Sequence, residues 1–536
     1  MDVKIGKEVR FSSDARDGLK EGLDILANAV KSTLGPRGRH AAIERSYGQP
    51  LITKDGVTVA RSITLSDRVR NMGAELIKSV ASSTNAVAGD GTTTATVLAQ
   101  AIYTEGAKMV AAGHNPVLIK RGIDKAVRVV SKKLVDIAKP LDNEDMINNV
   151  AIISANNDQE LGSLIGSVVS TVGNDGMISV EEATGLDTSV SYTEGINFDR
   201  GYITPTFATN MEKLTCELDN PYILLYDGRI SSTADLMPVL EAVSEQNRTL
   251  LVVAQTVENE ALQTLVLNKA RQALVSCAVR APGFGDIRKD MLEDIAVVSG
   301  GKLFSSEVPN SLRNASLNDL GQARRVVISR ANTSIIDGAG EPSSVERRAE
   351  RIRSHMNHNL EGFEYAALKS RLSSLSGAVA VLKVGGLSDS EVKEKKDRVE
   401  DAINAVKAAI EEGIVPGGGA ALLHCTKDLK ALKKEALMTE EIVGVDVIIN
   451  AIKAPFKQVL LNSGEEHHSY MEKIINSKNT SCGFDALRGN YLQDMYEAGI
   501  IDPVKVVRSA LENAASASGT LLTTEVTISH DDSGLE

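Results

Sequence analysis

The sequence predicts a multidomain fold, in which helical segments at both ends of the chain flank an α/β region in the middle. Three observations predict it. An apolar stripe with helical spacing stands near the start, short β-rich runs alternate with helical segments from about residue 195, and a long helical pattern follows at about residue 388. The pattern is compatible with an α/β domain inserted into a helical domain, although a pattern alone does not show that the two ends meet.

The bulk composition limits the class of protein. The chain has 536 residues, enough for several cores, and aromatic residues make up only 3%, so the cores must consist mainly of Ala, Val, Ile and Leu. The net charge of -12 argues against general nucleic-acid binding, which needs a basic surface. There is no apolar run of membrane-spanning length and no signal-peptide pattern, and the four cysteines stand singly. These features predict a cytoplasmic protein with no membrane or nucleic-acid partner.

The first element is predicted as a helix whose apolar stripe runs from Leu19 to Leu34. Ser13 is the expected N-cap, and Gly35-Pro36 the stop. Further elements are expected in this part of the chain: hairpin strands at 40–43 and 51–53 with a turn at 47–50, a helix over 74–84, and a helix from the GDGTTT sequence to about residue 113.

The middle of the chain predicts strands that alternate with helices and form a partly parallel sheet. The strands are expected at 222–226, 249–254, 274–279 and 325–328, and the helices at 234–245 and 258–271. A charged helical stretch over 342–376 and a long helix over 388–412 follow, and the remainder is expected to be helical up to a terminal strand at 521–528.

The GDGTTT sequence at residues 89–94 is a candidate anion site at the start of a helix. A helix N-terminus offers unpaired N–H groups and the positive end of a dipole. The motif has no lysine, so it is not a Walker A loop, and Asp90 would repel a phosphate unless a cation lay between them. Mg²⁺, which bridges carboxylate and phosphate oxygens, is the natural candidate. The pattern alone favours a simpler interpretation, a helix capped by an Asx turn.

Other candidate residues are ambiguous by pattern. Asp401 lies opposite the apolar stripe of its helix, as a solvated acid would, and Asp55 stands in an Asp-Gly turn pair. His467 and His468, with glutamates nearby, suggest a metal site, but an exposed charged helix end explains them as well. The helices at 234–245 and 258–271 carry apolar residues on more than one face, which is typical of burial on two sides or of an exposed protein-binding groove.

Segments along nearly the whole chain resemble GroEL-type group I chaperonins, in the order of that family. They are TLGPRGR, TKDGVTVAR, NMGAELIKSVAS, AGDGTTTATVLAQAI, NPVLIKRGIDKAV, ISANND, FDRGY, APGFGDIRK, DLGQARRVVI, KEKKDRVEDA, EEGIVPGGGAAL and AGIIDPVKVVRSALENAAS. The resemblance implies a mainly helical equatorial ATP-binding domain (1–136 and 412–536), a small intermediate hinge domain (137–193 and 380–411) and an inserted α/β apical substrate-binding domain (194–379). It also implies ring assembly, heptameric in the family, and ATP-driven folding of non-native proteins in a central cavity.

The resemblance further implies an ATP site that uses Mg²⁺ and K⁺. Asp90 would bind Mg²⁺, and Asp401 would orient or activate the attacking water when the subunit closes, with help from Asp55. Thr33 and the backbone oxygen of Lys54 would lie at the K⁺ site. The further nucleotide contacts that it implies are Leu34, Gly35 and Pro36 around the nucleotide, Gly91, Thr92, Thr93 and Thr94 at the phosphates, Ile153 and Gly418 at the adenosine, Asp485, Ala486 and Leu487 at the base, and Asp502 at the ribose.

The resemblance places a groove for client proteins and a GroES-type co-chaperonin in the apical domain. The implied groove residues are Tyr202, Phe207, Met237, Leu240, Leu262, Val266 and Leu267. Apolar contacts suit such a surface, because they are non-directional and accept many partners. The terminal strand and the early hairpin resemble elements that pair between neighbouring subunits.

The chain also departs from the family pattern. Asp485-Ala486-Leu487 stands where the family usually has Asn-Ala-Ala, Thr206 replaces an aromatic residue of the groove, and the Gly-Met-rich tail of many bacterial members is absent. The segment at 464–483 is unusual, and in the family this region touches the opposite ring. One or two rings, dependence on a co-chaperonin, and a bacterial or bacteriophage origin therefore stay open.

Two other classes of function fit the sequence less well than a chaperonin. The first is an oligomeric scaffold that binds non-native proteins with weak or uncoupled ATPase activity, and the retention of Asp55, Asp90 and Asp401 argues against it. The second is a small-molecule α/β enzyme, which is disfavoured because the sequence contains neither a catalytic-triad pattern nor a dinucleotide motif.

Overall fold

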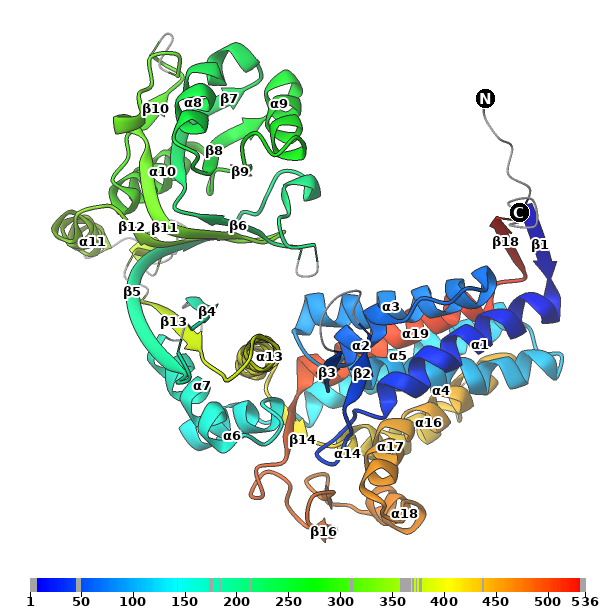
Figure 1. The fold of residues 1–536 in the computed structure, drawn as a ribbon. Helices are drawn as coiled ribbons and strands as arrows, with labels where there is room; N and C mark the ends of the chain where they lie inside the picture. The colour runs from blue at the N-terminus through cyan, green and yellow to red at the C-terminus, as the bar shows by residue number, and fades with distance from the viewer. Residues whose placement is uncertain are drawn as a thin grey trace. The chain divides into compact units, whose positions relative to one another are not determined.

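The computed structural model describes residues 7–44, 50–141, 143–172, 177–183, 185–211, 214–308, 312–356, 368, 371–372, 374–375, 378–435 and 438–530. The chain divides into two compact units (Figure 1), a helical unit of 1–174, 182–188 and 384–536 and an α/β unit of 175–181 and 189–383. This organisation confirms the multidomain fold class. The finer division into equatorial, intermediate and apical domains stays a prediction.

The helical unit is built from both ends of the chain. Its helices are α1 (Ser12–Lys31), α2 (Gly56–Ser62), α3 (Arg68–Ala88), α4 (Thr92–Ala111), α5 (Pro116–Asp136), α6 (Glu144–Ser154), α7 (Gln159–Val172), α13 (Asp389–Glu412), α14 (Ala420–His424), α15 (Thr426–Leu432), α16 (Thr439–Ala451), α17 (Ala454–Ser463), α18 (His468–Asn476) and α19 (Val504–Leu522). Apolar side chains of α1, α3, α4 and α19, among them Leu26, Ile77, Leu98 and Leu511, are fully buried in one core. The two ends of the sequence therefore share a hydrophobic core.

Short strands complete this unit in four antiparallel pairs among the described residues. They are β1 (Lys7–Phe11) with β18 (Val526–His530), β2 (Ala41–Ile43) with β3 (Leu51–Thr53), β14 (Ile414–Pro416) with β17 (Ile501–Pro503), and β15 (Gly483–Asp485) with β16 (Asn490–Leu492). The early hairpin is confirmed, although residues 47–49 of its predicted turn lie outside the described residues. The prediction of an all-helical remainder is wrong, because β14 to β17 interrupt it, and the terminal strand begins at Val526 rather than at Leu521.

The first helix begins differently from the prediction. Its N-cap is Phe11, which makes no side-chain capping bond, so the predicted N-cap Ser13 lies inside the helix. β1 runs directly into α1, and Glu525 accepts hydrogen bonds from the Ser12 N–H at 2.9 Å and from the Ser12 hydroxyl at 2.6 Å. Strand pairing with the other end of the chain (Figure 1) therefore sets the start of this helix.

The α/β unit contains a ten-stranded sheet with the order β4-β13-β5-β12-β11-β7-β8-β9, in which β10 also pairs with β7 and β6 with β11. Its strands are β4 (Met177–Glu182), β5 (Ser189–Phe198), β6 (Cys216–Asp219), β7 (Tyr222–Ile230), β8 (Leu250–Val257), β9 (Ser276–Arg280), β10 (Leu303–Ser305), β11 (Gly321–Ile328), β12 (Thr333–Gly338) and β13 (Ala378–Val384). β7 is parallel to β8 and β10, and β8 to β9. The partly parallel sheet is thus confirmed.

The helices of the α/β unit are α8 (Thr233–Glu245), α9 (Asn259–Ala270), α10 (Gly285–Ser299) and α11 (Pro342–Met356), with short 3-10 turns η1 (Pro205–Phe207) and η2 (Leu317–Asp319). The predicted helices at 234–245 and 258–271 are α8 and α9, which lie in contact. Most of the predicted charged stretch after Met356 falls outside the described residues. No helix of the described residues is long and apolar enough to span a membrane.

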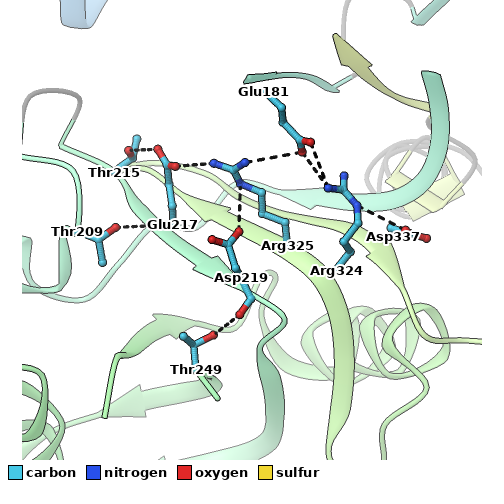
Figure 2. A network of polar contacts seen from close by, with 9 residues as sticks. All are labelled: Glu181, Thr209, Thr215, Glu217, Asp219, Thr249, Arg324, Arg325 and Asp337. Carbon is cyan, nitrogen blue, oxygen red and sulfur yellow. Dashed lines mark hydrogen bonds and ion pairs between the residues drawn. The ribbon is translucent and has the colours of Figure 1, made fainter. Parts of the chain in front are cut away.

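A network of charged side chains joins strands of this sheet (Figure 2). Arg324 of β11 donates to the Glu181 carboxylate of β4 at 3.0 and 3.2 Å. Its neighbour Arg325 lies 3.7 Å from Glu181 and donates to Glu217 of β6 at 2.5 Å. Partly exposed ion pairs contribute little individually, about 0–1 kcal/mol, so the network mainly fixes the side chains of Glu181 on β4 and Glu217 on β6 to the two arginines of β11.

Candidate functional site

The turn between α3 and α4 holds Asp90 between two glycines in the left-handed region, Gly89 at φ +69° and Gly91 at φ +82°. A Cβ added at Gly89 would lie 2.2 Å from the Cβ of Asn404, and one at Gly91 would lie 2.5 Å from Cγ1 of Val506. Both positions therefore require glycine for conformation and for space. The N-cap of α4 is Gly91, with no side-chain capping bond, so the helix starts without the cap that the simpler interpretation of GDGTTT needs.

Four carboxylates from four separate segments, those of Asp55, Asp90, Asp401 and Asp502, lie near enough to this turn for their charges to interact. Asp55 raises the pKa of Asp90 and of Asp401 through its charge, and Asp90 raises those of Asp401 and Asp502. For Asp90, Asp401 and Asp502, burial is the largest cause of the raised pKa. Such a cluster concentrates negative charge, which a cation or the positive end of a helix would offset.

Asp90 has two partners that favour its charged form. Its carboxylate accepts hydrogen bonds from the Gly91 N–H and, at 3.3 Å, from the Ser154 hydroxyl. These bonds oppose the effects of burial and of the Asp55 charge, and the pKa of Asp90 nevertheless stays raised. Ile153, the predicted adenosine contact, stands next to Ser154 at the end of α6 and is half-buried.

Asp55 is the N-cap of α2. Its carboxylate accepts hydrogen bonds from the N–H groups of Val57 at 3.1 Å and Thr58 at 2.8 Å. The next residue, Gly56, approaches α4 so closely that an added Cβ would lie 2.2 Å from Oγ1 of Thr93. The capping bonds hold Asp55 in place beside the start of α4, together with the neighbouring Lys54.

Asp401 projects from α13, which packs against the GDGTTT turn. Asn404 contacts Gly89, and Ala408 is buried with Ala88 of α3 and Val506 of α19. Burial and the charges of Asp55 and Asp90 raise the pKa of Asp401 well above its usual range. The pattern-based view of a solvated acid is therefore wrong, since this carboxylate is only partly exposed and faces other acids.

Asp502 and the glycine loop approach each other across a strand pair. Asp502 lies in β17 opposite Val415 of β14, and a Cβ added at Gly417 would lie 3.1 Å from its carboxylate oxygen Oδ1. Burial and the Asp90 charge raise the pKa of Asp502 to about 7. Gly418 has φ +62°, and a Cβ there would meet nothing within 4 Å. The loop thus presents open backbone beside a carboxyl group.

Side-chain hydrogen bonds hold the TLGPRG loop and join it to the turn that carries other predicted nucleotide contacts. Asn462 donates to the carbonyls of Lys31 and Leu34, both at 2.9 Å. Arg37 donates to the carbonyl of Leu487 at 2.6 Å, so the loop touches the turn at 485–487. Thr33 is buried, Leu34, Gly35 and Pro36 are half-buried, and the Thr33 hydroxyl donates to the Val30 carbonyl at 2.9 Å.

The departure at Asp485 has a local structural explanation. Its carboxylate accepts from the N–H groups of Leu487 at 2.9 Å and Arg488 at 3.1 Å, and it thereby closes its own turn. An asparagine oxygen could accept the same bonds, so the turn does not require the charge. Ala486 is buried, whereas the Leu487 side chain is 51% exposed.

The residues present fit a Mg²⁺–nucleotide better than a metal held by protein alone. Among the described residues, no group of three or more His, Cys, Asp or Glu side chains is placed to hold a metal ion, and this includes His467 and His468. Mg²⁺ with a nucleotide usually takes one or two carboxylates, and phosphates supply other ligands. Asp90, at an uncapped helix N-terminus with Thr92, Thr93 and Thr94, provides such a donor set.

The predicted groove residues are only partly exposed. Tyr202, Phe207 and Leu240 are buried, and Leu262 and Val266 are half-buried against the core of the α/β unit. Met237 on α8 is 39% exposed and Leu267 on α9 is 49% exposed. Lys269 donates to the carbonyls of Thr206 and Ala208 at 2.6 Å, which ties α9 to the η1 turn. Of the seven predicted groove residues, Met237 and Leu267 are therefore the two with exposed side chains.

Three residues with contacts at the site were not predicted. Ser154 donates to Asp90, Asn404 contacts Gly89, and Arg37 bonds to the turn at Leu487. Each lies next to a predicted residue or one helical turn from it: Ser154 follows Ile153, Asn404 lies three positions after Asp401, and Arg37 follows Pro36. Asn404 was the easiest of the three to find from the sequence, because a spacing of three residues places it on the same helix face as Asp401.

A helical unit that carries this loop cluster and receives an α/β insertion defines the fold class of the chaperonins. The family model described as the TCP-1/cpn60 chaperonin family matches residues 26–532, and the chain belongs to that family. Among solved structures, it is similar to the chaperonin gp146 from the bacteriophage EL 2 (Pseudomonas aeruginosa), crystallised in the presence of ATP-BeFx. Form II gives 24% identity and a TM-score of 0.68, and form I gives 23% and 0.63; each match covers 98% of this chain and 99% of that one.

Proposed function

We propose that this protein is an ATP-dependent chaperonin that assembles into heptameric rings, binds non-native proteins and promotes their folding in a central cavity. The observation that carries the proposal is the uncapped N-terminus of α4 beside Asp90, against which the segments of Asp55 and Asp401 pack through Gly56 and Asn404. This arrangement would suit a phosphate chain with its cation. The structures of gp146, crystallised in the presence of ATP-BeFx, support nucleotide as the ligand.

In this proposal, the start of α4 binds the phosphates. The N–H groups of its first turn and the hydroxyls of Thr92 to Thr94 would donate to phosphate oxygens. Mg²⁺, held by Asp90, would neutralise phosphate charge, and K⁺ would be held by backbone oxygens of Thr33 and Lys54. Gly38 packs closely against the Thr33 carbonyl, since a Cβ there would lie 2.0 Å from that oxygen.

Asp401 is the proposed base that orients the attacking water. Its raised pKa suits a group that exchanges a proton, and its helix is in direct contact with the phosphate-binding turn. Asp55, fixed by its capping bonds, would hold the charge that tunes Asp401. Gly418, Ile153, Asp502 and the turn at 485–487 would enclose the nucleoside.

Client proteins would bind to the exposed apolar side chains of α8 and α9, with Met237 and Leu267 as the accessible contacts. Methionine suits such a surface, because its flexible side chain adapts to different partners. A GroES-type co-chaperonin would use the same face. The alternative is a binding scaffold with weak or uncoupled ATPase activity, which would need the groove but not Asp401.

The two functions differ in a refolding experiment. A denatured client enzyme is refolded with the full-length protein, with and without ATP, and electron microscopy of the same samples shows rings and their number. The chaperonin predicts rings and an ATP-dependent gain in refolded yield. Equal yields with and without ATP, from intact rings, would support the scaffold instead. Repeating the assay with an added co-chaperonin tests the need for a cap.

A further inference from the structure

Three strands of the α/β unit adjoin the points where the chain passes from one unit to the other. β4 and β13 each contain such a boundary, between 181 and 182 and between 383 and 384, and β5 begins directly after a third, between 188 and 189. β4 pairs with β13, and β13 pairs with the first half of β5, over 189–194. We call these three segments the connecting strands. Because they are the covalent connections, a force on the chain from the helical unit reaches the α/β unit through them.

The connecting strands join the rest of the sheet through β5. This strand exchanges its partner β13 for β12 between Glu194 and Gly195. In the described part of the chain, β4 has β13 as its strand partner and β11 has β12, β7 and β6, so strand pairing does not join β4 to β11. A small apolar cluster also spans the junction, since Ile336 of β12 and Val381 of β13 are buried together and Val327 of β11 packs against them. Apolar contacts are non-directional, so this cluster permits a small rotation.

Two neighbouring arginines of β11 hold Glu181 of β4 across this junction (Figure 2). Arg324 donates to the Glu181 carboxylate at 3.0 and 3.2 Å, and Arg325 lies 3.7 Å from it. The Glu181 side chain is only 12% exposed, so its charge depends on these partners. The contact therefore fastens β4 directly to β11, which strand pairing does not do.

Both arginines keep another acid if Glu181 leaves. Arg324 lies 3.5 Å from Asp337, and Arg325 donates to Glu217 at 2.5 Å. Opening the contact would therefore leave neither arginine unpaired, and the released Glu181 carboxylate would gain water. Partly exposed ion pairs contribute little net free energy, so such a contact can open and close without a large cost. These are the properties of a reversible latch.

We propose that Glu181, Arg324 and Arg325 form a latch that governs the orientation of the connecting strands. In the closed state, which the structure shows, Glu181 binds both arginines. In the open state, the connecting strands turn about the apolar cluster and the junction in β5, and Glu181 enters solvent. The arginines then keep Asp337 and Glu217 as their partners.

Glu217 also connects the latch to the predicted client surface. The Thr209 hydroxyl accepts a hydrogen bond from the Glu217 N–H at 2.8 Å, and Lys269 of α9 donates to the Ala208 carbonyl at 2.6 Å. A client that displaced this segment would move Glu217 and draw Arg325 away from the latch. We therefore expect a bound client to favour the open state. This consequence rests on the proposed function, whereas the latch itself does not.

Spin labels measure the two states in the full-length protein without nucleotide. The labels are attached at Tyr192→Cys, in the first half of β5, and at Glu245→Cys, at the end of α8, because both side chains are exposed. The four native cysteines are buried, so the labels react with the introduced ones. An excess of unlabelled protein removes distances between copies. We expect one distance for the unaltered latch, and for Glu181→Gln a second distance with about a fivefold rise in the ratio of open to closed states, the magnitude expected for one partly exposed ion pair.

Two further variants separate the latch from the general loss of an ion pair. Asp235→Asn is the matched control, because it removes the pair with Arg313 at 2.8 Å, in the same unit but outside the latch. The double variant Arg324→Gln/Arg325→Gln should give the same second distance as Glu181→Gln, since both remove the same contact. The latch is refuted if Glu181→Gln and Asp235→Asn have equal distance distributions.

High salt tests the latch without a change in the network. In about 1 M salt, charges act over only about 3 Å, so the exposed members of the network weaken. The second distance should then grow in the protein with the unaltered latch, and Glu181→Gln should respond less. An equal response of the two proteins would contradict the assigned contact.

A denatured client enzyme, added to the same labelled proteins, tests the link to the client surface. A bound client should increase the second distance, and Glu217→Gln should reduce this increase. An unchanged distribution with the client bound would exclude the link through Glu217. Failure of the client to bind would instead count against the proposed function, so the two failures are distinguishable.

Discussion

Gly89 and Asn404 are in direct contact, because the space where a Cβ of Gly89 would stand is filled by the side chain of Asn404. Gly89 belongs to the turn that presents Asp90, and Asn404 lies one helical turn after Asp401. This contact, together with the packing of Ala408 against Ala88, holds the proposed base near the proposed metal ligand. Movement of α13 away from the turn would therefore separate the proposed base from the proposed phosphate site.

Gly89→Ala tests this contact. The change places a Cβ 2.2 Å from that of Asn404, at a residue with φ +69°. We therefore expect backbone strain and overpacking to lower the free energy of unfolding by about 2–4 kcal/mol. Gly113→Ala is the control, since Gly113 also has a positive φ, +93°, but nothing lies within 4 Å of an added Cβ. Its free energy of unfolding should fall by only about 1–2 kcal/mol. Urea unfolding measures both. Equal losses would show that the contact with Asn404 is unimportant.

Asp401→Asn should reduce ATP turnover by about 10²–10⁴-fold, the usual contribution of a positioned base, while nucleotide still binds. Phosphate release and calorimetric nucleotide binding give the two quantities. Glu411→Gln, at the other end of α13 and paired with Lys505 at 2.6 Å, is the control for a lost charge on the same helix. Turnover of Asp401→Asn within a few-fold of the unaltered protein would exclude the assigned role.

Asp502→Asn should change how stability depends on pH. The folded-state pKa of Asp502 is about 7, against 3.8 for the unperturbed group, so the folded state favours the protonated form. This contribution is fully present below about pH 4 and is lost as the pH rises through about 7. Asparagine does not ionise, so the variant should gain stability relative to Asp502 over this interval, by up to about 1.4 kcal/mol per unit of pKa difference. Unfolding by urea between about pH 4 and pH 8 checks the sign, and a constant difference would refute it.

Substitutions of the predicted groove residues should have two different effects, one on stability and one on client binding. Phe207→Ala should destabilise the protein by about 3–5 kcal/mol, because Phe207 is fully buried. Met237→Ser and Leu267→Ser should change stability by no more than about 0.5 kcal/mol and still weaken capture of a denatured client. Thermal unfolding and co-sedimentation with the client measure the two effects. Unchanged client capture by the double variant would place the binding surface elsewhere.

Much of the fold was predictable, because long helices carry strong periodic signals. The helix predicted over 388–412 is α13, which runs over 389–412 with Ser388 as its N-cap, and the turn before Thr92 was identified from its glycines. The start of α1 was not predictable, since it depends on pairing with Glu525, at the far end of the chain. The strands of three residues, β14 to β17, are too short to show alternation.

The candidate site follows from the resemblance and only partly from the residues themselves, and it stays a prediction. The pattern around Asp401 favours a solvated acid, and only tertiary packing shows that it faces Asp55 and Asp90. Likewise, the apolar pattern of α8 and α9 is compatible with helices buried on two sides and with an exposed binding groove. In the structure most of these apolar side chains are buried, whereas Met237 and Leu267 are exposed. The burial of a residue depends on neighbours that are distant in the sequence, so a local pattern does not determine it.

The pairing of β1 with β18 has a consequence for biosynthesis. The strand at Lys7–Phe11 acquires its partner only when Val526–His530 has left the ribosome, and α1 shares its core with α19. The α/β unit, largely continuous from 189 to 383, meets no such delay and can fold during translation. We therefore expect the inserted unit to reach its native state first, while the flanking helices wait, with exposed apolar faces, for the end of synthesis.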